Sequence, residues 1–197
     1  MIIDQLTRTI QLKICYFGPA LSGKTTSIKA LFNHFGMKDR VLSIDSSVRR
    51  TLFFDYGTIS FQNQQWNLKI HIYTTTGQDF YIITRPVTLE AIDGIIFVAD
   101  SQQEVYYRNF TSWNELCSYF EDVIISLPKV IAFNKQDLPD KFPTSVFLEN
   151  INYFKFKNID FKKTIALNGE GILDSFEEIL SLVFKNIYKG QIISALQ

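Results

Sequence analysis

The chain has 197 residues, of which 46% are hydrophobic and 20% are charged, and its 20 basic and 20 acidic side chains give a net charge of zero. This composition is that of a globular protein and excludes a disordered one, and the length predicts a single domain. A neutral chain lacks the basic field that non-specific nucleic-acid binding needs, so nucleic acid is not expected as a partner.

The chain ends and the cysteines show no targeting or redox signal. The first residues are not a signal peptide, residue 2 is isoleucine rather than the glycine of a myristoylation site, and the last residues contain no cysteine for prenylation. No apolar stretch approaches the ~20 residues of a membrane span. Cys15 and Cys117 lack metal-site spacing and are interpreted as buried, reduced thiols. We expect a cytoplasmic protein without a lipid anchor, which reaches membranes only indirectly.

Apolar runs typical of strands alternate with helical patterns along the chain, which indicates an α/β fold with a mostly parallel sheet. The expected strands cover residues 10–17, 58–62, 68–73, 94–99, 129–133 and 163–167, and residues 40–44 form a short further segment. The expected helices cover residues 24–35, 79–91, 106–124, 144–153 (with Thr144 as its cap) and 172–188. The run 94–99 is apolar throughout, as expected for a strand with both faces covered.

Residues 18–25 read GPALSGKT and match the phosphate-binding motif G-x-x-x-x-G-K-[ST], between an expected strand and an expected helix. Such a loop directs backbone N–H groups and a positive helix N-terminus towards phosphate. Lys24 would supply a charge to the β- and γ-phosphates, and the Thr25 hydroxyl would bind Mg²⁺. The other predicted nucleotide contacts in this segment are Leu21, Ser22, Gly23 and Thr26. The motif alone leaves ATP and GTP as alternatives.

Residues 134–137 read NKQD and follow the expected strand 129–133. The Asp137 carboxylate can accept both N1–H and the exocyclic amine of guanine, and adenine offers no such pair. The methylene stem of Lys135 can lie over the base. With Asn134, these residues predict a guanine nucleotide, and we also expect contacts from Ala166, whose backbone N–H would donate to O6, and from Leu167.

Two polar segments lie between these motifs. Residues 74–78 read TTTGQ, where the Gly77 N–H would bind the γ-phosphate and Gln78 would orient the attacking water. Thr51 would move to contact Mg²⁺ and the γ-phosphate. Of Arg49 and Arg50, one would reach the γ-phosphate as an arginine finger; the alternative is that both belong to a solvated surface.

Together these residues resemble the Ras-like small GTPase superfamily and, within it, the MglA group of bacterial polarity switches. The stretches that carry the resemblance, over about residues 10–189, are GPALSGKTT, RTLFFD, YTTTGQDFY, DGIIFVADSQ and NKQDLP. Several archaeal Ras-like proteins are also similar. The resemblance implies one G domain over residues 1–197, with its core at about 10–190, and a six-stranded sheet of order 2-3-1-4-5-6 with helices on both faces.

The resemblance also implies a function. It implies binding of GTP or GDP with Mg²⁺, and a hydrolytic cycle that reshapes switch regions near 45–58 and 74–86 and signals to effectors, in cell polarity or motility. Arg50 corresponds to an intrinsic arginine finger, a group worth about 10³–10⁵ in rate in related enzymes, so the candidate catalytic residues are Gln78, Arg50 and Lys24. A GTPase-activating protein of roadblock fold is the implied partner.

The chain departs from the family pattern at three positions. Thr74 replaces an aspartate that in most small GTPases supports Mg²⁺ through water, so weaker support is expected. Ala20 replaces a common glycine, and its methyl group is expected to crowd Gln78 and slow hydrolysis. Arg49 replaces an acidic residue before the finger.

Partner contacts are predicted, as an alternative to core packing, for Phe53, Phe54 and Phe80.

These observations leave a hydrolysing switch as the main interpretation and two alternatives. Ala20 and Thr74 favour a GTP-bound scaffold with little intrinsic hydrolysis that acts through partner proteins. A P-loop ATPase or small-molecule kinase is the other alternative, and the N-K-x-D segment argues against it.

We predict that Gln78→Leu abolishes GTP turnover and leaves GTP affinity nearly intact, because an apolar side chain cannot orient the attacking water. Single-turnover hydrolysis and nucleotide binding of the purified variant measure the two effects. Unchanged turnover would show that Gln78 has another role.

Overall fold

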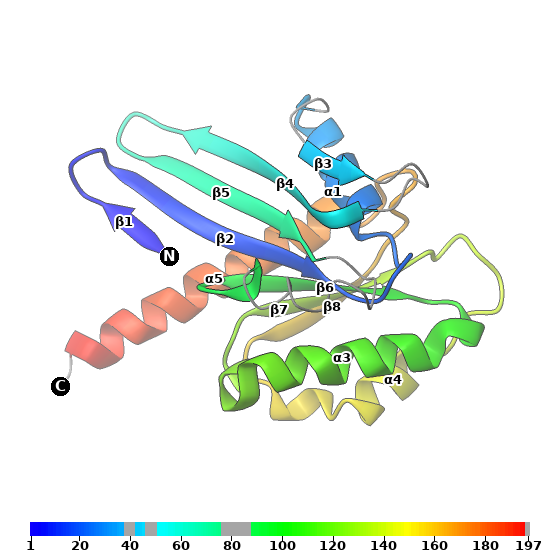
Figure 1. The fold of residues 1–197 in the computed structure, drawn as a ribbon. Helices are drawn as coiled ribbons and strands as arrows, with labels where there is room; N and C mark the ends of the chain where they lie inside the picture. The colour runs from blue at the N-terminus through cyan, green and yellow to red at the C-terminus, as the bar shows by residue number, and fades with distance from the viewer. Residues whose placement is uncertain (38–41, 46–50, 76–87, 196–197) are drawn as a thin grey trace.

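The computed structural model of the chain describes residues 1–37, 42–45, 51–75 and 88–195. These residues form an eight-stranded sheet with helices on both faces (Figure 1). The strands are β1 (Ile2–Asp4), β2 (Thr9–Phe17), β3 (Leu42–Asp45), β4 (Thr51–Gln62), β5 (Asn67–Thr74), β6 (Gly94–Asp100), β7 (Lys129–Asn134) and β8 (Ile159–Lys163). The α-helices are α1 (Lys24–His34), α3 (Tyr106–Phe120), α4 (Thr144–Asn150) and α5 (Ile172–Ala195). Three 3-10 helices are described: η3 (Gln103–Val105), η4 (Glu121–Ile125) and η5 (Tyr153–Lys155).

The strand order is β3-β4-β5-β2-β6-β7-β8, with β1 beside β2. Strands β5, β2, β6, β7 and β8 are parallel, and β4 is antiparallel to β5. The six predicted strands therefore lie in the predicted order, 2-3-1-4-5-6, and the α/β fold class is confirmed. β1 and β3 are additional. β1 pairs with residues 9–11 of β2, where β6 is not yet a neighbour because its pairing with β2 begins at Ile14.

Several element boundaries differ from the sequence prediction. The last strand covers Ile159–Lys163 rather than 163–167, because the ladder with β7 runs from Lys129↔Ile159 to Phe133↔Lys163 and residues 164–167 continue as a loop. Thr144 is the first residue of α4 and not its cap, which is Pro143. Most of the helix expected at 79–91 falls outside the described residues.

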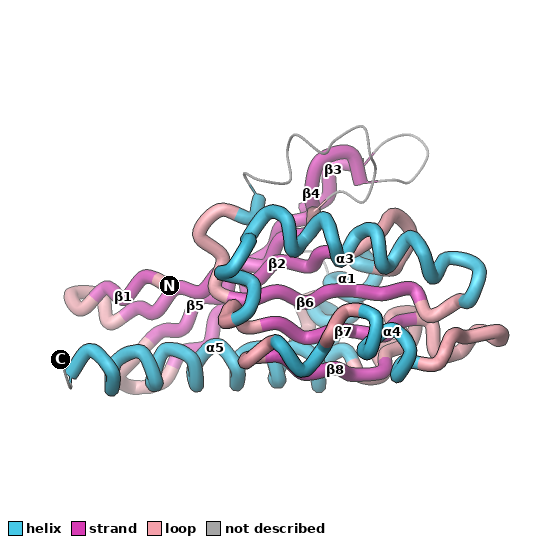
Figure 2. Tube along the Cα trace, turned by 90° about the horizontal axis from the view of Figure 1, so that it is seen from below, coloured by secondary structure: helices cyan, strands magenta, loops and turns pink. Residues whose placement is uncertain are grey.

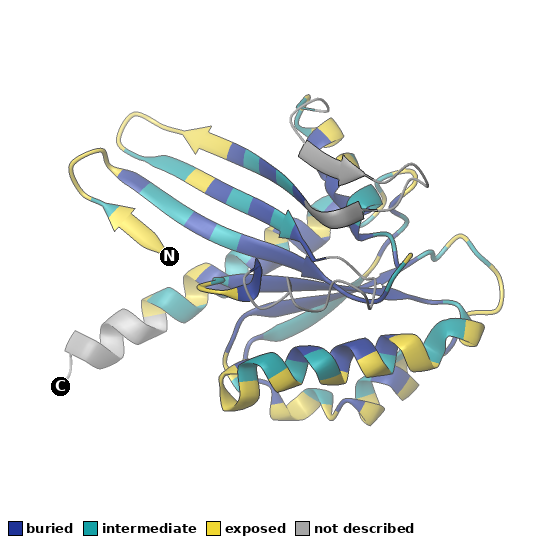
Figure 3. Cartoon of the chain, in the orientation of Figure 1, coloured by how far each residue is buried: buried dark blue, intermediate teal, exposed yellow. Residues whose placement is uncertain are grey.

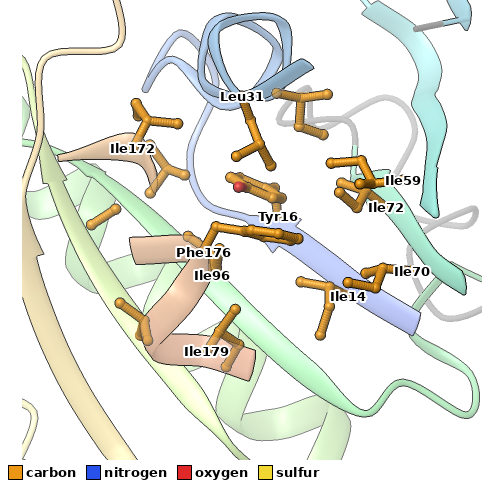
Figure 4. Packing of buried hydrophobic residues seen from close by; sticks show 14 of the residues in the cluster. Ile14, Tyr16, Leu31, Ile59, Ile70, Ile72, Ile96, Ile172, Phe176 and Ile179 are labelled. Carbon is orange, nitrogen blue, oxygen red and sulfur yellow. The ribbon is translucent and has the colours of Figure 1, made fainter. Parts of the chain in front are cut away.

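The central strands of the sheet are buried on both faces, as expected from their apolar sequences. Every residue of β6 and β7 is buried (Figure 3). Neighbouring apolar residues of these strands belong to opposite cores. Ile96 packs with α1 and α5, where Leu31 and Phe176 lie beside Tyr16 (Figure 4). Phe97 packs on the other face with Trp113 of α3. Figure 2 shows α3 and α4 over the strands of that second face.

The apolar residues that recur at steps of three and four over 106–124 predict a buried stripe, and these residues, which lie in α3 and η4, belong to the core. Trp113 and Ile124 are buried, and four further members are partly buried against the same cluster: Tyr106, Phe110, Cys117 and Phe120. In α5, the apolar spacing of residues 172–188 predicts that Phe184 faces inwards with Phe176 and Ile179, but Phe184 is 39% exposed. Val183, one residue earlier, faces Gly94 of β6, and Ile187 still packs against the core, so Phe184 lies to one side of the buried stripe of the helix.

Both cysteines are free thiols in the described structure. Cys15 is fully buried, and burial raises the pKa of its thiol to about 12. Cys117 is only partly buried, contrary to the prediction of two buried thiols, and partial burial raises its pKa as well. Among the described residues, no helix is long and apolar enough to cross a membrane.

Lys129, the first residue of β7, is an unusual core residue because its charged side chain is fully buried. Its Nζ has no hydrogen-bond partner among the described residues and lies 4.8 Å from the centroid of the Phe156 ring. Desolvation lowers the pKa of Lys129 to about 7, and the opposing influence of Cys117 is smaller. The ordinary value in an unfolded chain is about 10.4.

We predict that Lys129→Met raises the free energy of unfolding at pH 7 by about 1–3 kcal/mol, because it removes a buried polar group without a partner. Between the folded and unfolded pKa values, the unfolded chain binds more protons, so wild-type stability rises with pH from about 7 to about 10. Urea unfolding at pH 7 and 9 measures both effects, and the variant is expected to lose this slope.

Lys155→Met is the matched control, because Lys155 is exposed and its Nζ lies 5.1 Å from the centroid of the same Phe156 ring. The control should change neither stability nor slope appreciably. Equal effects of the two substitutions would contradict the assignment of the pH dependence to Lys129.

Candidate functional site

The two predicted binding motifs lie together at the carboxyl ends of the parallel strands. The loop 18–23 joins β2 to α1, residues 135–137 follow β7, and residues 164–167 follow β8. In open α/β sheets this edge is where ligands bind. The fold therefore brings together segments that are more than 100 residues apart in sequence.

The loop 18–23 packs so closely on the sheet that two of its glycines admit no side chain. A Cβ on Gly18 would lie 2.3 Å from the Val98 carbonyl oxygen, and one on Gly23 would lie 2.2 Å from the Asn134 amide nitrogen. Both residues have positive φ, +143° and +104°. The glycines of the motif therefore lie where the backbone of the loop approaches the sheet, Gly18 at β6 and Gly23 at β7.

Lys24 is 7% exposed, and its ammonium group lies over the loop. Its Nζ donates hydrogen bonds to the carbonyl oxygens of Gly18 at 2.8 Å and Pro19 at 2.7 Å. The first turn of α1, which also contains Thr25 and Thr26, has no acidic side chain to offset the positive helix N-terminus. Ammonium and helix end together make the loop suited to an anion.

Asn134 joins the phosphate loop to the predicted base segment. It is 2% exposed, and its Nδ2 donates to the Ser22 carbonyl oxygen at 2.8 Å. Its Oδ1 accepts from the Ala166 backbone N–H at 2.9 Å and from the Thr164 hydroxyl at 3.2 Å. One side chain therefore fixes the relative positions of the loops that follow β2, β7 and β8.

The remaining predicted base contacts surround this amide. Lys135 has a left-handed backbone, φ 65°, and its Nζ lies 2.6 Å from Asp100 Oδ2. Asp137 is exposed, and Leu167 is 83% exposed at the same edge. The Ala166 N–H, predicted to donate to guanine O6, donates to Asn134 in this structure.

Asp55 on β4 is a site residue to which the sequence analysis assigned no role. It is fully buried, and its Oδ2 accepts from the Thr25 hydroxyl at 2.5 Å and the Thr74 hydroxyl at 3.0 Å. The Asp55 backbone N–H donates to Thr74 Oγ1 at 2.7 Å. A carboxylate thus lies next to Thr74, the position whose missing acid was expected to weaken the site.

The register of β4 and β5 explains why Asp55 lies beside Thr74. Gln62 lies opposite Asn67 and Tyr56 opposite Tyr73, so the same register places Asp55 opposite Thr74. The acid is therefore supplied across the ladder rather than along the strand. Asp55 is the last residue of the run RTLFFD, which carries part of the family resemblance.

Part of the predicted site lies outside the described residues. This applies to Arg49, Arg50, Gly77, Gln78 and Phe80, and to the side chains of Thr51, Phe53 and Phe54. The backbone of Thr51 is described as the first residue of β4. The catalytic and switch roles of these residues remain predictions.

Comparison with known proteins defines the class. The model of the Ras family matches residues 14–185, which include both motifs, so the chain belongs to the Ras family of small GTPases. This confirms the family inferred from the motifs.

Among its relatives, the chain is similar to the mutual gliding-motility protein MglA of Myxococcus xanthus (strain DK1622), with 32% identity over 194 residues, 95% of this chain and 98% of that protein. It is 27% identical over 176 residues to Ras-related protein Rab-11C of Dictyostelium discoideum, covering 87% and 72% of the two chains. It is 24% identical over 183 residues to ADP-ribosylation factor-like protein 6 of Caenorhabditis elegans, covering 83% and 96%.

We predict that Gly23→Ala destabilises the fold by several kcal/mol more than Gly36→Ala. Both glycines have positive φ, but a Cβ on Gly36 would meet nothing within 4 Å, whereas one on Gly23 would displace the buried Asn134 amide. The control should lose only about 1–2 kcal/mol, the backbone cost of a left-handed alanine. Denaturant unfolding of both variants measures the difference, and equal losses would contradict the close approach at Gly23.

Proposed function

We propose that this chain binds GTP and GDP with Mg²⁺, hydrolyses GTP, and acts as a molecular switch through segments near 45–58 and 74–86. The observation that carries the proposal is the hydroxyl–carboxylate cluster of Thr25, Asp55 and Thr74 beside the phosphate loop. Membership of the Ras family supports the same activity.

The cluster fits a magnesium ion. Asp55 Oδ1 is buried and has no hydrogen-bond partner among the described residues, while the other oxygen, Oδ2, is 2.5 Å from the Thr25 hydroxyl. Mg²⁺ prefers such oxygen ligands and keeps several of its waters. Thr25 and Thr51 would hold the ion directly, and Asp55 would hold one of its waters. When bound, Mg²⁺ neutralises charge on the β- and γ-phosphates.

The nucleotide base is proposed to lie against the segments that Asn134 joins. Lys135 and Asp137 would contact guanine, with Ala166 and Leu167 at its edge. Leu21, Ser22, Gly23, Lys24, Thr25 and Thr26 would surround the phosphates, with Gly77 at the γ-phosphate. Ser22 supports this placement, because its buried Oγ has no hydrogen-bond partner among the described residues.

Hydrolysis is proposed to use three residues. Gln78 would orient the water, Arg50 would stabilise charge on the γ-phosphate as a finger, and Lys24 would stabilise the β- and γ-oxygens. The Lys24 ammonium group lies next to the loop, where it donates to the carbonyl oxygens of Gly18 and Pro19. A bound phosphate would attract this positive charge. The remaining two roles rest on the sequence motifs.

The cellular role is proposed from the relatives. A relative named for gliding motility supports a function in polarity or motility. The proposed partners, effector proteins and a roadblock-type GTPase-activating protein in the cytoplasm, rest on the resemblance of the sequence motifs alone. A GTP-bound scaffold with little hydrolysis is the alternative, favoured by Ala20. The second argument for it, the missing acid at Thr74, is weakened by the position of Asp55.

Single-turnover GTP hydrolysis by the purified chain with Mg²⁺ tests the proposal. A rate well above roughly 10⁻⁴ s⁻¹, the value for a small GTPase without its finger, would support a finger in the chain itself. A rate at or below this value that a roadblock-type protein does not raise would favour the scaffold. No binding of guanine nucleotide would overturn both.

We predict that Asp55→Asn raises the Mg²⁺ concentration needed for half-maximal GTP hydrolysis by about 10- to 100-fold, because the groups that orient a metal's ligands contribute this much to its affinity. The double variant Asp55→Asn, Thr74→Asp should recover most of the loss, since it returns the carboxylate from the opposite strand. A magnesium titration of hydrolysis measures both.

Asp122→Asn is the control, because Asp122 is exposed in η4 on a different part of the molecule. Its magnesium dependence should equal that of the wild type. An unchanged titration for Asp55→Asn would contradict the role of Asp55, whereas failure of the double variant alone would show that the carboxylate is required on β4.

A further inference from the structure

We infer that Asp100 is a positioning residue for Lys135, and that it fixes the lysine stem at the base site. This inference rests on the proposed guanine site, because the lysine would contact the base. The two residues lie at the carboxyl ends of neighbouring strands. Asp100 is the last residue of β6, and Lys135 directly follows β7.

The ion pair is short and mostly shielded from water. Lys135 Nζ lies 2.6 Å from Asp100 Oδ2, and the side chains are 27% and 6% exposed. The other carboxylate oxygen, Oδ1, accepts from the Gln102 backbone N–H at 3.2 Å. Because both oxygens are engaged, the carboxylate has one orientation and the ammonium group one place to bind.

Asp100 is itself fixed by α3. Asn109, which is fully buried, accepts from the Asp100 N–H through Oδ1 at 2.9 Å and donates from Nδ2 to the Asp100 carbonyl oxygen at 2.7 Å. The pairing of β6 with β2 ends at Phe97, so this amide takes the place of a neighbouring strand. On its other side Asp100 pairs with Asn134 of β7.

These contacts determine the path of the lysine stem. The left-handed backbone of Lys135, φ 65°, begins the stem beside Asn134, and Asp100 holds its end at β6. The methylene groups therefore span the carboxyl ends of two strands. A lysine side chain without this ion pair would lose rotamer entropy when a base binds. In this chain the ion pair fixes the side chain on folding, so that entropy is not lost on binding.

Dissociation of a fluorescent GDP analogue, displaced by excess GDP, tests the inference. Asp100→Asn keeps the size of the side chain and removes the charge, and it should accelerate dissociation about 3- to 10-fold, in line with the ordering cost of one long side chain. Lys135→Met keeps much of the stem and removes the ammonium group, and it should accelerate dissociation by a similar factor.

The double variant separates positioning from a merely structural effect. If Asp100 acts through Lys135, then D100N changes the rate less than twofold in a K135M background. Equal acceleration in both backgrounds, or no acceleration in the wild type, overturns the inference. Should D100N fail to fold, Asp100→Glu displaces the carboxylate by one methylene group and is expected to show the same dependence on Lys135.

The outcomes also distinguish this inference from the proposed function. A wild-type chain that binds the GDP analogue with an unchanged rate in D100N contradicts only the role of Asp100. A wild-type chain that binds no guanine nucleotide overturns the proposed function and this inference together.

Discussion

The site depends on one buried amide, the side chain of Asn134. Its three hydrogen bonds connect the Ser22 carbonyl oxygen, the Thr164 hydroxyl and the Ala166 N–H, so the loops after β2, β7 and β8 cannot move independently. If this buried amide lost its partners, the fold would lose about 1–3 kcal/mol of stability for each unsatisfied group. The absence of a side chain at Gly23 is what lets the phosphate loop reach this amide.

The acid next to the phosphate loop shows a second constraint, which comes from the sheet. Strands β4 and β5 are antiparallel, so residues far apart in sequence have side chains directly opposite one another. Asp55 and Thr74 form such a pair, and Thr25 reaches the same carboxylate from α1. The antiparallel register thus places the Asp55 carboxylate beside Thr74, although the two residues are 19 positions apart in sequence.

Much of the fold was predictable because its signals are local. Each of the six expected strands is an apolar or alternating run, and the two motifs fall on strand ends, where a parallel sheet collects ligand contacts. The sequence prediction was wrong where contacts with other elements determine the local structure. The apolar run at 163–167 resembles a strand, but pairing with β7 selects Ile159–Lys163. Phe184 follows the apolar residues of α5 but lies to one side of the buried stripe that contains Val183 and Ile187. Asp55, Asp100 and Asn109 became visible only through contacts between elements.

The position of Asp55 has a consequence for how this protein's relatives are compared with it. Compared position by position with the family pattern, Thr74 is a lost acid, although a carboxylate is present on the neighbouring strand. A chain with both acids would place two like charges opposite each other, which destabilises a sheet. A chain with neither would leave the Thr25 hydroxyl without this acceptor. Moving the acid from one strand to the other by single substitutions therefore passes through a less favourable sequence.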